Sequence, residues 1–389
     1  MTKLEQLLAD LCPNGVEYKT VQAAVGVNRG KRLTKSQLSE DGEYEVYHGS
    51  KDSILGKYNQ YNAPANTTIV VNTGGIGGVK FLDKPFWCSD GSFWLGQSDS
   101  IDSKFLYYCL SGYEDYFYSQ KRVGGVPTID RSVVEDFKIP IPPLPVQSEI
   151  VRILDNFTGL TAELTAELTA RKQQYAHYRE KILSRTSNAE QLALQDIVAD
   201  SCSISYGIVQ TGDDVENGIP VVRPVDLTDK IVSLRGLKKV DPSIAEPYKR
   251  TILKGGDLLL CVRGTTGVIS IASNELRGCN VSRGIVPLTF KSTVCPQYIY
   301  YQFLSQGIQK EIELKTRGAA LKQINMEDLR QIRFPLPAFE VQQQIVSILD
   351  RFDSLCNDIS VGLPAEIEAR RKQYEYYRDK LLTFTEKTS

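Results

Sequence analysis

The side chains that most often carry out catalysis or bind metals are scarce in this sequence. It has two histidines, His48 and His177, which lie far apart along the chain. Two distant histidines provide few of the side chains that a His-based metal site or a Ser-His-Asp triad needs. His177 lies in a Tyr-rich helical segment, where packing is the favoured role. His48, in the sequence VYHGSKDS, could contact a ligand, but an ordinary loop histidine is the favoured interpretation.

Two Gly-rich stretches invite comparison with phosphate-binding loops: TGGIGG at 73–78 and RGTTG at 263–267. Neither has the G-K-[ST] ending of a P-loop, and neither opens a clear helix. The first also lacks the G-x-G-x-x-G spacing of a dinucleotide site. Tight turns between two strands are the favoured structure for both. The scattered carboxylates form no recognisable pair, so the sequence indicates a binding or scaffolding protein.

Basic side chains gather in segments rich in Gly, Ser and Thr, which are expected to be loops. Such residues suit contacts to phosphates and base edges. For any single one, a solvated surface charge is the competing interpretation. Arg122 and Arg317 stand out because they occupy corresponding positions in two similar parts of the chain. The basic loop residues are Arg29, Lys31, Arg32, Lys35, Lys121, Arg122, Arg223, Arg263, Arg283, Lys315, Arg317 and Lys322.

The composition is that of an ordinary soluble protein. The 389 residues predict two or three domains, with 41% hydrophobic and 24% charged residues. No apolar run approaches the ~18–20 residues of a membrane span, and the N-terminus lacks the features of a signal peptide. The eight cysteines are dispersed, so reduced cysteines in a cytoplasmic protein are expected. A net charge of −1 neither indicates nor excludes nucleic-acid binding.

The chain contains the same plan twice. The sequence IPIPPLPVQSEIVRILDNF at 139–157 corresponds to IRFPLPAFEVQQQIVSILDRF at 332–352, with an offset of 195 residues. Further on, ARKQQYAHYREKIL from Ala170 corresponds to ARRKQYEYYRDKLL from Ala369, with an offset of 199 residues. The second copy therefore has four more residues between these blocks, about one helical turn.

Each repeated block predicts a long helix that follows a Pro-rich strand exit. Proline interrupts a helix interior, so the helices should begin near Val146 and Phe339. Apolar residues then recur at helical spacing, and a helix from Val146 to Leu183 would be roughly 55 Å long. Two such helices are predicted to pair as an antiparallel coiled coil, with a kink or offset at Leu363-Pro364. The alternative is that each helix packs on its own domain.

The segments that precede the two helices also correspond. NTTIVVNTGGIGGVKFL at 66–82 parallels GDLLLCVRGTTGVISIA at 256–272, and each predicts a strand, a Gly-rich turn and a second strand. Ile129 is opposite Ile324, as Arg122 is opposite Arg317. The predicted fold class is α+β: two mixed domains and two long helices, related by a pseudo-twofold axis. The predicted boundaries are 1–145 and 186–338 for the domains and 146–185 and 339–389 for the helices.

These repeated blocks resemble the specificity (S) subunit of type I restriction–modification systems. The shared features are two globules, each followed by PxP…VQ..IV.ILD.F and a helix ending in QY..YR.K.L. GIPVVRPVDL and GDLLLCVRGTTG are also similar to the target recognition domains of that family. The stretch QSEIVRILDNFTGLTAELTAELTARKQQY resembles the type IC subgroup in particular, where the TAEL word occurs in the central conserved region.

The resemblance implies a DNA-binding protein of bacterial defence with no catalytic or metal-binding residues of its own. Each target recognition domain would read one half of a split, asymmetric site on double-stranded DNA. The implied partners are two methyltransferase (HsdM) subunits, which bind S-adenosylmethionine and methylate adenine, and restriction (HsdR) subunits, which use ATP and Mg. The competing interpretation is a non-enzymatic coiled-coil scaffold with two protein-binding domains.

The predicted DNA contacts combine basic loop residues with residues of the Gly-rich turns. The first turn lacks an arginine at the position of Arg263, so the first domain departs from the family pattern there. The residues predicted to contact DNA are Arg29, Lys31, Arg32, Asn72, Thr73, Lys121, Arg122, Arg223, Arg263, Thr265, Arg283, Arg317 and Lys322.

The word Thr-Ala-Glu-Leu occurs twice in succession, at 161–164 and 165–168. Ala, Leu and Glu favour a helix. A period of four exceeds 3.6 residues per turn, and coiled coils accommodate such a step as a stutter. One unit would therefore add about one turn, ~6 Å, to a helical spacer. The predicted spacer residues are Thr161, Leu164, Thr165 and Leu168.

Overall fold

The computed structural model of this chain describes residues 2–122, 124–318, 322–357 and 362–387. The chain divides into two compact units. Unit 1 comprises Met1–Ala166 and Ala365–Ser389, and unit 2 comprises Glu167–Pro364. Among the described residues, no helix has the length and apolar character needed to cross a membrane.

Unit 1 combines short helices with three small sheets. Its elements are α1 (Lys3–Leu11), β1 (Glu17–Thr20), α2 (Val21–Ala24), β2 (Val27–Arg29), η1 (Lys35–Gln37), β3 (Tyr44–Tyr47), β4 (Gly56–Tyr58), β5 (Thr67–Val71), β6 (Val79–Leu82), β7 (Trp87–Cys88), β8 (Ser92–Leu95), α3 (Ser103–Ser111), α4 (Glu114–Ser119), α5 (Arg131–Glu135), β9 (Lys138–Ile141), the first part of α6 (Leu144–Ser184) and nearly all of α13 (Leu363–Leu381). The sheet orders are β2-β8-β5-β6, β4-β3-β7 and β1-β9.

Unit 2 repeats much of this plan. Its further elements are β10 (Gln191–Ala193), α7 (Leu194–Ile197), β11 (Ile219–Val222), η2 (Pro224–Asp226), β12 (Ile231–Val232), β13 (Lys238–Val240), α8 (Pro242–Ala245), η3 (Glu246–Thr251), β14 (Leu258–Cys261), β15 (Ile269–Ala272), η4 (Asn274–Leu276), β16 (Asn280–Val281), β17 (Ile285–Leu288), α9 (Pro296–Phe303), α10 (Gln306–Lys315), α11 (Met326–Arg330), β18 (Arg333–Pro335) and α12 (Phe339–Asn357). The sheet orders are β12-β15-β14-β17, β13-β11-β16 and β10-β18.

The central strand of each larger sheet is buried along its whole length. These strands are β5 in unit 1 and β14 in unit 2, and both read as continuous runs of β-branched or apolar residues. A strand covered on both faces is expected to lack alternation of polar and apolar residues. Helix α3 packs on β5 and β6, and α9 packs on β15. The strand–turn–strand predictions at 66–82 and 256–272 and the α+β fold class are therefore confirmed.

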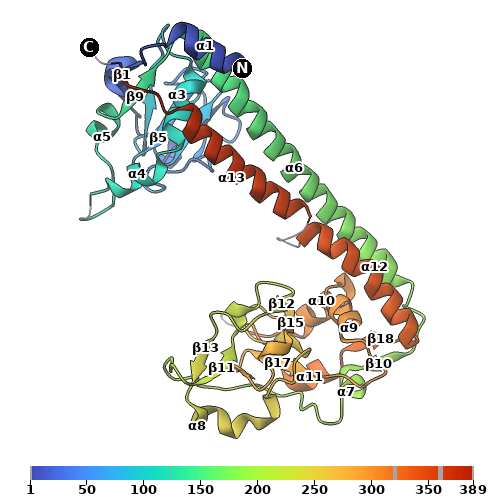
Figure 1. The fold of residues 1–389 in the computed structure, drawn as a ribbon. Helices are drawn as coiled ribbons and strands as arrows, with labels where there is room; N and C mark the ends of the chain where they lie inside the picture. The colour runs from blue at the N-terminus through green and yellow to red at the C-terminus, as the bar shows by residue number, and fades with distance from the viewer. Residues whose placement is uncertain (1, 123, 319–321, 358–361, 388–389) are drawn as a thin grey trace. The chain divides into compact units, whose positions relative to one another are not determined.

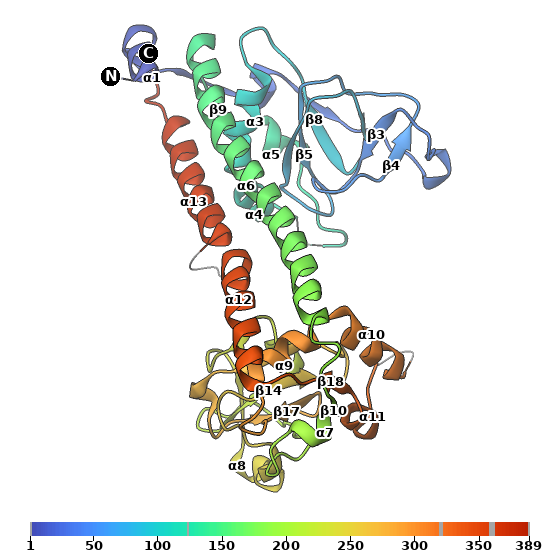
Figure 2. The ribbon, with the colours of Figure 1, turned by 90° about the vertical axis from the view of Figure 1, so that its right-hand side faces the viewer.

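A pair of long helices belongs to each unit. In unit 1 the first part of α6 runs opposite to α13, and the rings of Phe157 and Tyr377 stack with centroids 5.4 Å apart (Figure 1). In unit 2 the last part of α6 runs opposite to α12, and Tyr178 stacks on Phe352 (Figure 2). The sequence thus correctly predicted that helices of the two repeats pair with one another.

The second repeat does not form one uninterrupted helix. Helix α12 ends at Asn357 and α13 begins at Leu363, whereas α6 is a single helix of 41 residues. Gly362 has φ 99°, a left-handed conformation that ends helices, and Pro364 cannot occupy a helix interior. The expected offset at Leu363-Pro364 is confirmed, but a single helix over 339–389 is wrong.

Each long helix is fixed to its domain by a fully buried glutamine near its start. The Gln147 Oε1 accepts the Asp102 amide hydrogen at 2.8 Å, and its Nε2 donates to two carbonyls. Gln342 likewise accepts the Cys295 amide hydrogen at 2.8 Å and donates to two carbonyls. The repeated Val-Gln pair of the sequence therefore joins helix and domain, because buried amides need partners on both polar atoms.

A second duplicated contact lies about two helical turns after each buried glutamine, along the same helix. Tyr108 donates to Asp155 at 2.6 Å in unit 1, and Tyr301 donates to Asp350 at 2.5 Å in unit 2. Burial, and then the neighbouring carboxylate, raises the pKa of both tyrosines, so each keeps its hydrogen for donation. The ILD sequences of the repeats are thus structural anchors.

The segment that follows α13 is not helical. The amide of Val16 donates to the carbonyl of Thr385 at 2.9 Å, and the amide of Lys387 donates to that of Val16. Tyr18 adds a hydrogen bond to the carbonyl of Phe384 at 3.1 Å. The predicted helix therefore gives way to an extended segment that pairs with Val16, the residue before β1.

Candidate nucleic-acid interface

The Gly-rich stretches form the same turn in both units. In unit 1 the amide of Gly77, which has φ 84°, donates to the carbonyl of Val71 at 2.9 Å. In unit 2 the amide of Gly267, with φ 89°, donates to Cys261 at the same distance. Glycine adopts these positive φ values without the clash that a β carbon would cause. The interpretation of both stretches as turns between strands is confirmed.

A second segment crosses each turn and brings distant basic residues to it. In unit 2, Arg317 and Gln323 exchange backbone hydrogen bonds of 2.8 and 2.9 Å, and Gln323 also forms a bridge with Arg263. The amide of Gly264 donates to the carbonyl of Lys322 at 2.8 Å. Arg263 therefore lies on backbone that adjoins Arg317 and Lys322, although more than 50 residues separate it from each of them.

Unit 1 has the same crossing with other side chains. Thr128 forms bridges with both Thr73 and Arg122, and the Arg122 amide donates to the Thr128 carbonyl at 2.9 Å. The hydroxyls of Thr73 and Thr128 are 3.2 Å apart. The sequence alignment of Arg122 with Arg317 is thus confirmed by the backbone pairing, and Thr73 occupies the position of Arg263.

A third segment completes the surface in unit 2. The Val262 amide donates to Gly284 at 2.8 Å, and a β carbon on Gly284 would lie 2.5 Å from the ring of Pro224. This close approach places Arg283 and Arg223 next to the turn. The structure thus gathers four of the predicted arginines of unit 2 around one turn: Arg223, Arg263, Arg283 and Arg317.

Two of the predicted cations already have acidic partners. Arg223 pairs with Asp226 at 3.0 Å, and this hydrogen-bonded carboxylate raises the pKa of the guanidinium. Arg122 pairs with Asp130. Lys121 lies over the ring of Tyr118, 3.6 Å from its centroid. Within the described residues, the predicted cations that form no ion pair are Arg29, Lys31, Arg32, Lys121, Arg263, Arg283, Arg317 and Lys322.

The basic residues of the first loop lie on and after β2. Arg29, Lys31 and Arg32 are all exposed. The Lys31 amide donates to the carbonyl of Cys88 at 2.9 Å, and its carbonyl accepts a 2.7 Å hydrogen bond from the Trp87 indole. These backbone bonds hold the loop against β7 and leave the cationic side chains in solvent.

Asn72 is the predicted contact residue that is buried. Its side chain is 5% exposed, and its Oδ1 has no hydrogen-bond partner among the described residues. Its backbone bonds to Gly91 and to Ile129, so it helps to assemble the crossing. Because its side chain is covered, the structure does not present Asn72 on the surface. Thr265, by contrast, is exposed, with its hydroxyl 3.4 Å from the Cys261 sulfur.

Asp90, which is not among the predicted contact residues, lies beside His48, which the sequence analysis interpreted as an ordinary loop histidine. The His48 Nδ1 lies 3.3 Å from a carboxylate oxygen of Asp90, and both side chains are partly exposed beside the first turn. The comparison with unit 2 becomes possible only when the strands are known, since His48 follows β3 just as Arg223 follows β11.

The predicted spacer residues lie within α6. The hydroxyl of Thr161 donates to the carbonyl of Phe157 at 2.9 Å, and that of Thr165 donates to Thr161 at 2.7 Å. Leu164 and Leu168 are half-buried. The helical conformation expected for the TAEL words is confirmed.

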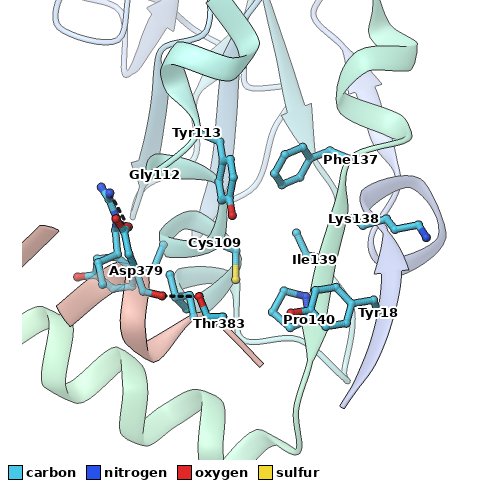
Figure 3. Close-up of a pocket in the computed structure, with 13 residues that line it drawn as sticks. Tyr18, Cys109, Gly112, Tyr113, Phe137, Lys138, Ile139, Pro140, Asp379 and Thr383 are labelled. Carbon is cyan, nitrogen blue, oxygen red and sulfur yellow. Dashed lines mark hydrogen bonds and ion pairs between the residues drawn. The ribbon is translucent and has the colours of Figure 1, made fainter. Parts of the chain in front are cut away.

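One cavity of unit 1 lies apart from these turns. It has a volume of about 360 Å³, between the end of α3, β9 and the residues around the end of α13 (Figure 3). Its wall includes Tyr18, Cys109, Tyr113 and Phe137, and the pair Arg378–Asp379 at 2.7 Å. None of its lining residues belongs to the Gly-rich turn or its crossing segment. Among the described residues, no cluster of His, Cys, Asp or Glu could hold a metal.

Known proteins share this architecture. One solved structure, the S subunit of a type I restriction–modification system from M. genitalium, is 17% identical, with a TM-score of 0.54 over 95% of this chain and 96% of that chain. Another, from a structure that describes complex assembly and conformational transition of the type I R-M system, is 16% identical, with a TM-score of 0.59 over 96% and 98%. At this identity the likeness establishes the fold alone.

Sequence comparison establishes the family. The chain is 36% identical over 271 residues to the EcoR124I/EcoR124II specificity subunit of Escherichia coli, and the match spans 64% of this chain and 63% of that subunit. A Haemophilus influenzae protein named as a type I restriction enzyme specificity subunit is 28% identical over 407 residues, 99% of each chain. Assignment to the type IC subgroup stays a prediction.

The family model covers most of both units. It is described as the type I restriction modification DNA specificity domain, and it matches residues 13–171 and 208–369. The two matches correspond to the two copies of the repeat, and each includes one of the Gly-rich turns. The chain therefore belongs to the type I restriction–modification DNA specificity family.

Proposed function

We propose that each unit of this chain reads one half of a bipartite, asymmetric DNA site. The observation that carries the proposal is the duplicated turn and crossing segment, in which one backbone frame holds different side chains that are at least partly exposed. Two copies of one frame with different side chains suit two different half-sites. The alternative, a scaffold with two protein-binding domains, explains neither the repeated frame nor the gathered arginines.

The chemistry of the exposed residues fits DNA. An arginine can donate two hydrogen bonds to guanine O6 and N7, a contact worth ~1–3 kcal/mol of discrimination. Arg263, Arg283 and Arg317 are the residues of unit 2 that are free of described ion pairs and surround one turn. The exposed lysines would neutralise phosphates, which contribute affinity without reading sequence. A net charge of −1 is compatible with this role if partner subunits supply further cationic surface.

The chain would not catalyse a reaction by itself. Two methyltransferase (HsdM) subunits would dock on the paired helices, bind S-adenosylmethionine and methylate adenine in each half-site. Restriction (HsdR) subunits would add translocation and cleavage that depend on ATP and Mg. A cytoplasmic location, where these substrates and DNA meet, follows from the proposal.

A methylome tests this function directly. The chain is co-expressed with the products of its neighbouring genes, and methylated adenines are located across the genome. We expect one split motif with a fixed spacer. Replacing residues 15–140 with those of a relative should change one half of the motif and leave the other half intact. Absence of any sequence-specific methylation, or a change in both halves, contradicts the proposal.

We also propose that the length of α6 sets the spacer between the two half-sites. Helix α6 passes through both TAEL words without interruption, and four residues add about 6 Å of helix. We expect insertion of a third TAEL after Leu168 to lengthen the spacer between half-sites by one or two base pairs, since base pairs repeat every ~3.4 Å. Both half-sites should stay the same. An unchanged spacer contradicts the role of α6 in setting it.

A further inference from the structure

The strand registers of the two units identify equivalent positions that the sequences do not reveal. In unit 1, β3 pairs in parallel with β7, so that Tyr47 lies opposite Cys88. In unit 2, β11 pairs in parallel with β16, so that Val222 lies opposite Val281. The residue that follows each first strand is therefore equivalent: His48 in unit 1 and Arg223 in unit 2.

The same register extends into the next segment. The Ser89 amide donates to the Tyr47 carbonyl at 2.9 Å, and the Ser282 amide donates to the Val222 carbonyl at 2.9 Å. The following residues, Asp90 and Arg283, are thus equivalent.

Backbone hydrogen bonds to the Gly-rich turns identify a third pair of equivalent positions. The carbonyl of Gly91 accepts the Asn72 amide hydrogen at 3.0 Å, and that of Gly284 accepts the Val262 amide hydrogen at 2.8 Å. Thr73 is therefore equivalent to Arg263, in agreement with the bridges to Thr128 and Gln323. Around one turn, unit 2 presents three arginines where unit 1 presents a histidine, an aspartate and a threonine.

The local geometry holds Asp90 in place. The His48 Nδ1 accepts the Gly91 amide hydrogen at 3.1 Å, and the Ser89 hydroxyl donates to an Asp90 carboxylate oxygen at 3.1 Å. The same Nδ1 lies 3.3 Å from a carboxylate oxygen of Asp90. The Asp90 side chain remains 32% exposed, which leaves carboxylate surface for a further donor.

A carboxylate at this position has a restricted role on DNA. Phosphates repel it, so it cannot substitute for the charge of Arg283 in backbone contacts. The donors that DNA offers to a carboxylate in the major groove are exocyclic amino groups, N4 of cytosine and N6 of adenine. An aspartate in the recognition frame is therefore suited to base reading.

We propose that Asp90 is a specificity-determining residue for the half-site read by unit 1, where it accepts a hydrogen bond from the amino group of cytosine or adenine. His48 is a positioning residue, which fixes the segment 89–91 through Nδ1. This assignment rests on the proposed function and deepens it. It gives unit 1 a hydrogen-bond acceptor at the position where unit 2 has the donor Arg283.

The test is the methylome of the assembled methyltransferase with three variants. Asp90→Asn replaces half of the acceptor surface with a donor, and we expect roughly tenfold weaker preference at one base pair of the unit 1 half-site. His48→Ala should relax the same half-site. His48→Asn should restore it, because the asparagine Oδ1 can replace Nδ1 as acceptor of the Gly91 amide hydrogen. The unit 2 half-site should not change in any variant.

A matched control is Glu40→Gln, which neutralises an exposed acid of unit 1 outside the equivalent positions. It should leave the motif as it is. A wild-type split motif that persists unchanged in Asp90→Asn would overturn this inference while leaving the proposed function intact. A change confined to the unit 2 half-site would overturn it as well, and failure of His48→Asn to restore the motif would overturn the role of His48.

Discussion

The frames built by the Gly-rich turn and its crossing segment in the two units differ in their side chains far more than in their backbones. Unit 1 and unit 2 share the turn, the crossing segment and the parallel strand pair, with hydrogen bonds between equivalent amides and carbonyls. Yet Thr73, His48 and Asp90 stand where unit 2 has arginines. The frame is thus held mainly by main-chain bonds that both units share, and in unit 1 the His48 side chain adds an acceptor for the Gly91 amide hydrogen. Side chains that take no part in these bonds can therefore change without loss of the fold.

The largest expected difference between the frames is in the stability lost when a β carbon is added to the turn glycine of each unit, Gly77 or Gly267. A β carbon at Gly77 would lie 2.6 Å from the backbone oxygen of Glu114, whereas at Gly267 it would meet the movable side chain of Gln309 at 2.8 Å. Both positions cost about 1–2 kcal/mol for positive φ, and the fixed contact adds about 1–3 kcal/mol. We expect Gly77→Ala to lower the free energy of unfolding more than Gly267→Ala in urea titrations. Equal losses would show that the two turns have equivalent surroundings.

The buried glutamines should instead behave alike. Gln147→Leu and Gln342→Leu each leave one buried amide hydrogen and two carbonyls without their partner. We expect each to lower the free energy of unfolding by about 2–3 kcal/mol, measured by chemical denaturation. The control is Gln173→Leu, on an exposed position of α6, which should change little. A large difference between the two glutamines would mean that one helix is held mainly by other contacts.

The equivalent residues Arg122 and Arg317 should differ in their contribution to DNA binding. Arg122 is engaged by Asp130, whereas Arg317 forms no ion pair with a described residue. We expect Arg317→Ala to weaken binding of the assembled complex about tenfold, which corresponds to about 1.4 kcal/mol, and Arg122→Ala to have a smaller effect. Asp130→Asn should strengthen binding by releasing Arg122. Equilibrium binding to the identified site measures all three, and an unchanged affinity for Arg317→Ala would remove it from the contact surface.

The smallest effect concerns acid stability. The hydrogen bonds from Arg152 and then Lys3 lower the pKa of Glu149 from 4.5 to about 2, and the equivalent residue in unit 2 is the non-titrating Gln344. Because the folded pKa is the lower one, this stabilisation is complete above pH 4.5 and is lost as the pH falls toward 2. Both cations are largely exposed, so we expect less than about 1 kcal/mol. Glu149→Gln should flatten the unfolding free energy across this range, and an unaltered pH profile would contradict the assignment.

Local pattern was enough to predict much of this fold. Helical spacing and proline positions predicted the start of α6 and α12 to within two residues, and the repeat offsets aligned Arg122 with Arg317. These features depend on neighbouring residues or on near-identical words. The interruption at Leu363 was also readable, since proline and the four extra residues both mark it.

The remainder depended on contacts between distant segments. The equivalence of Asp90 with Arg283 follows from the parallel pairs β3–β7 and β11–β16, whose partners are about 40 to 60 residues apart and share no obvious word. Asn72, which is buried, likewise bonds through its backbone to the distant residues Gly91 and Ile129. Sequence alone therefore found where basic residues gather but not which acidic residue joins them.

The threonine hydroxyls of α6 have a mechanical consequence. Thr158, Thr161 and Thr165 each donate to the carbonyl four residues earlier, at 3.2, 2.9 and 2.7 Å. Such hydroxyls compete with the main-chain amides for the same oxygens, which favours bending of a helix. Each TAEL word adds one threonine, so a longer spacer would also be a more compliant one. Under the proposed function, variation in repeat number would then adjust how readily the two units tolerate a bent or over-twisted DNA, in addition to the length of the spacer.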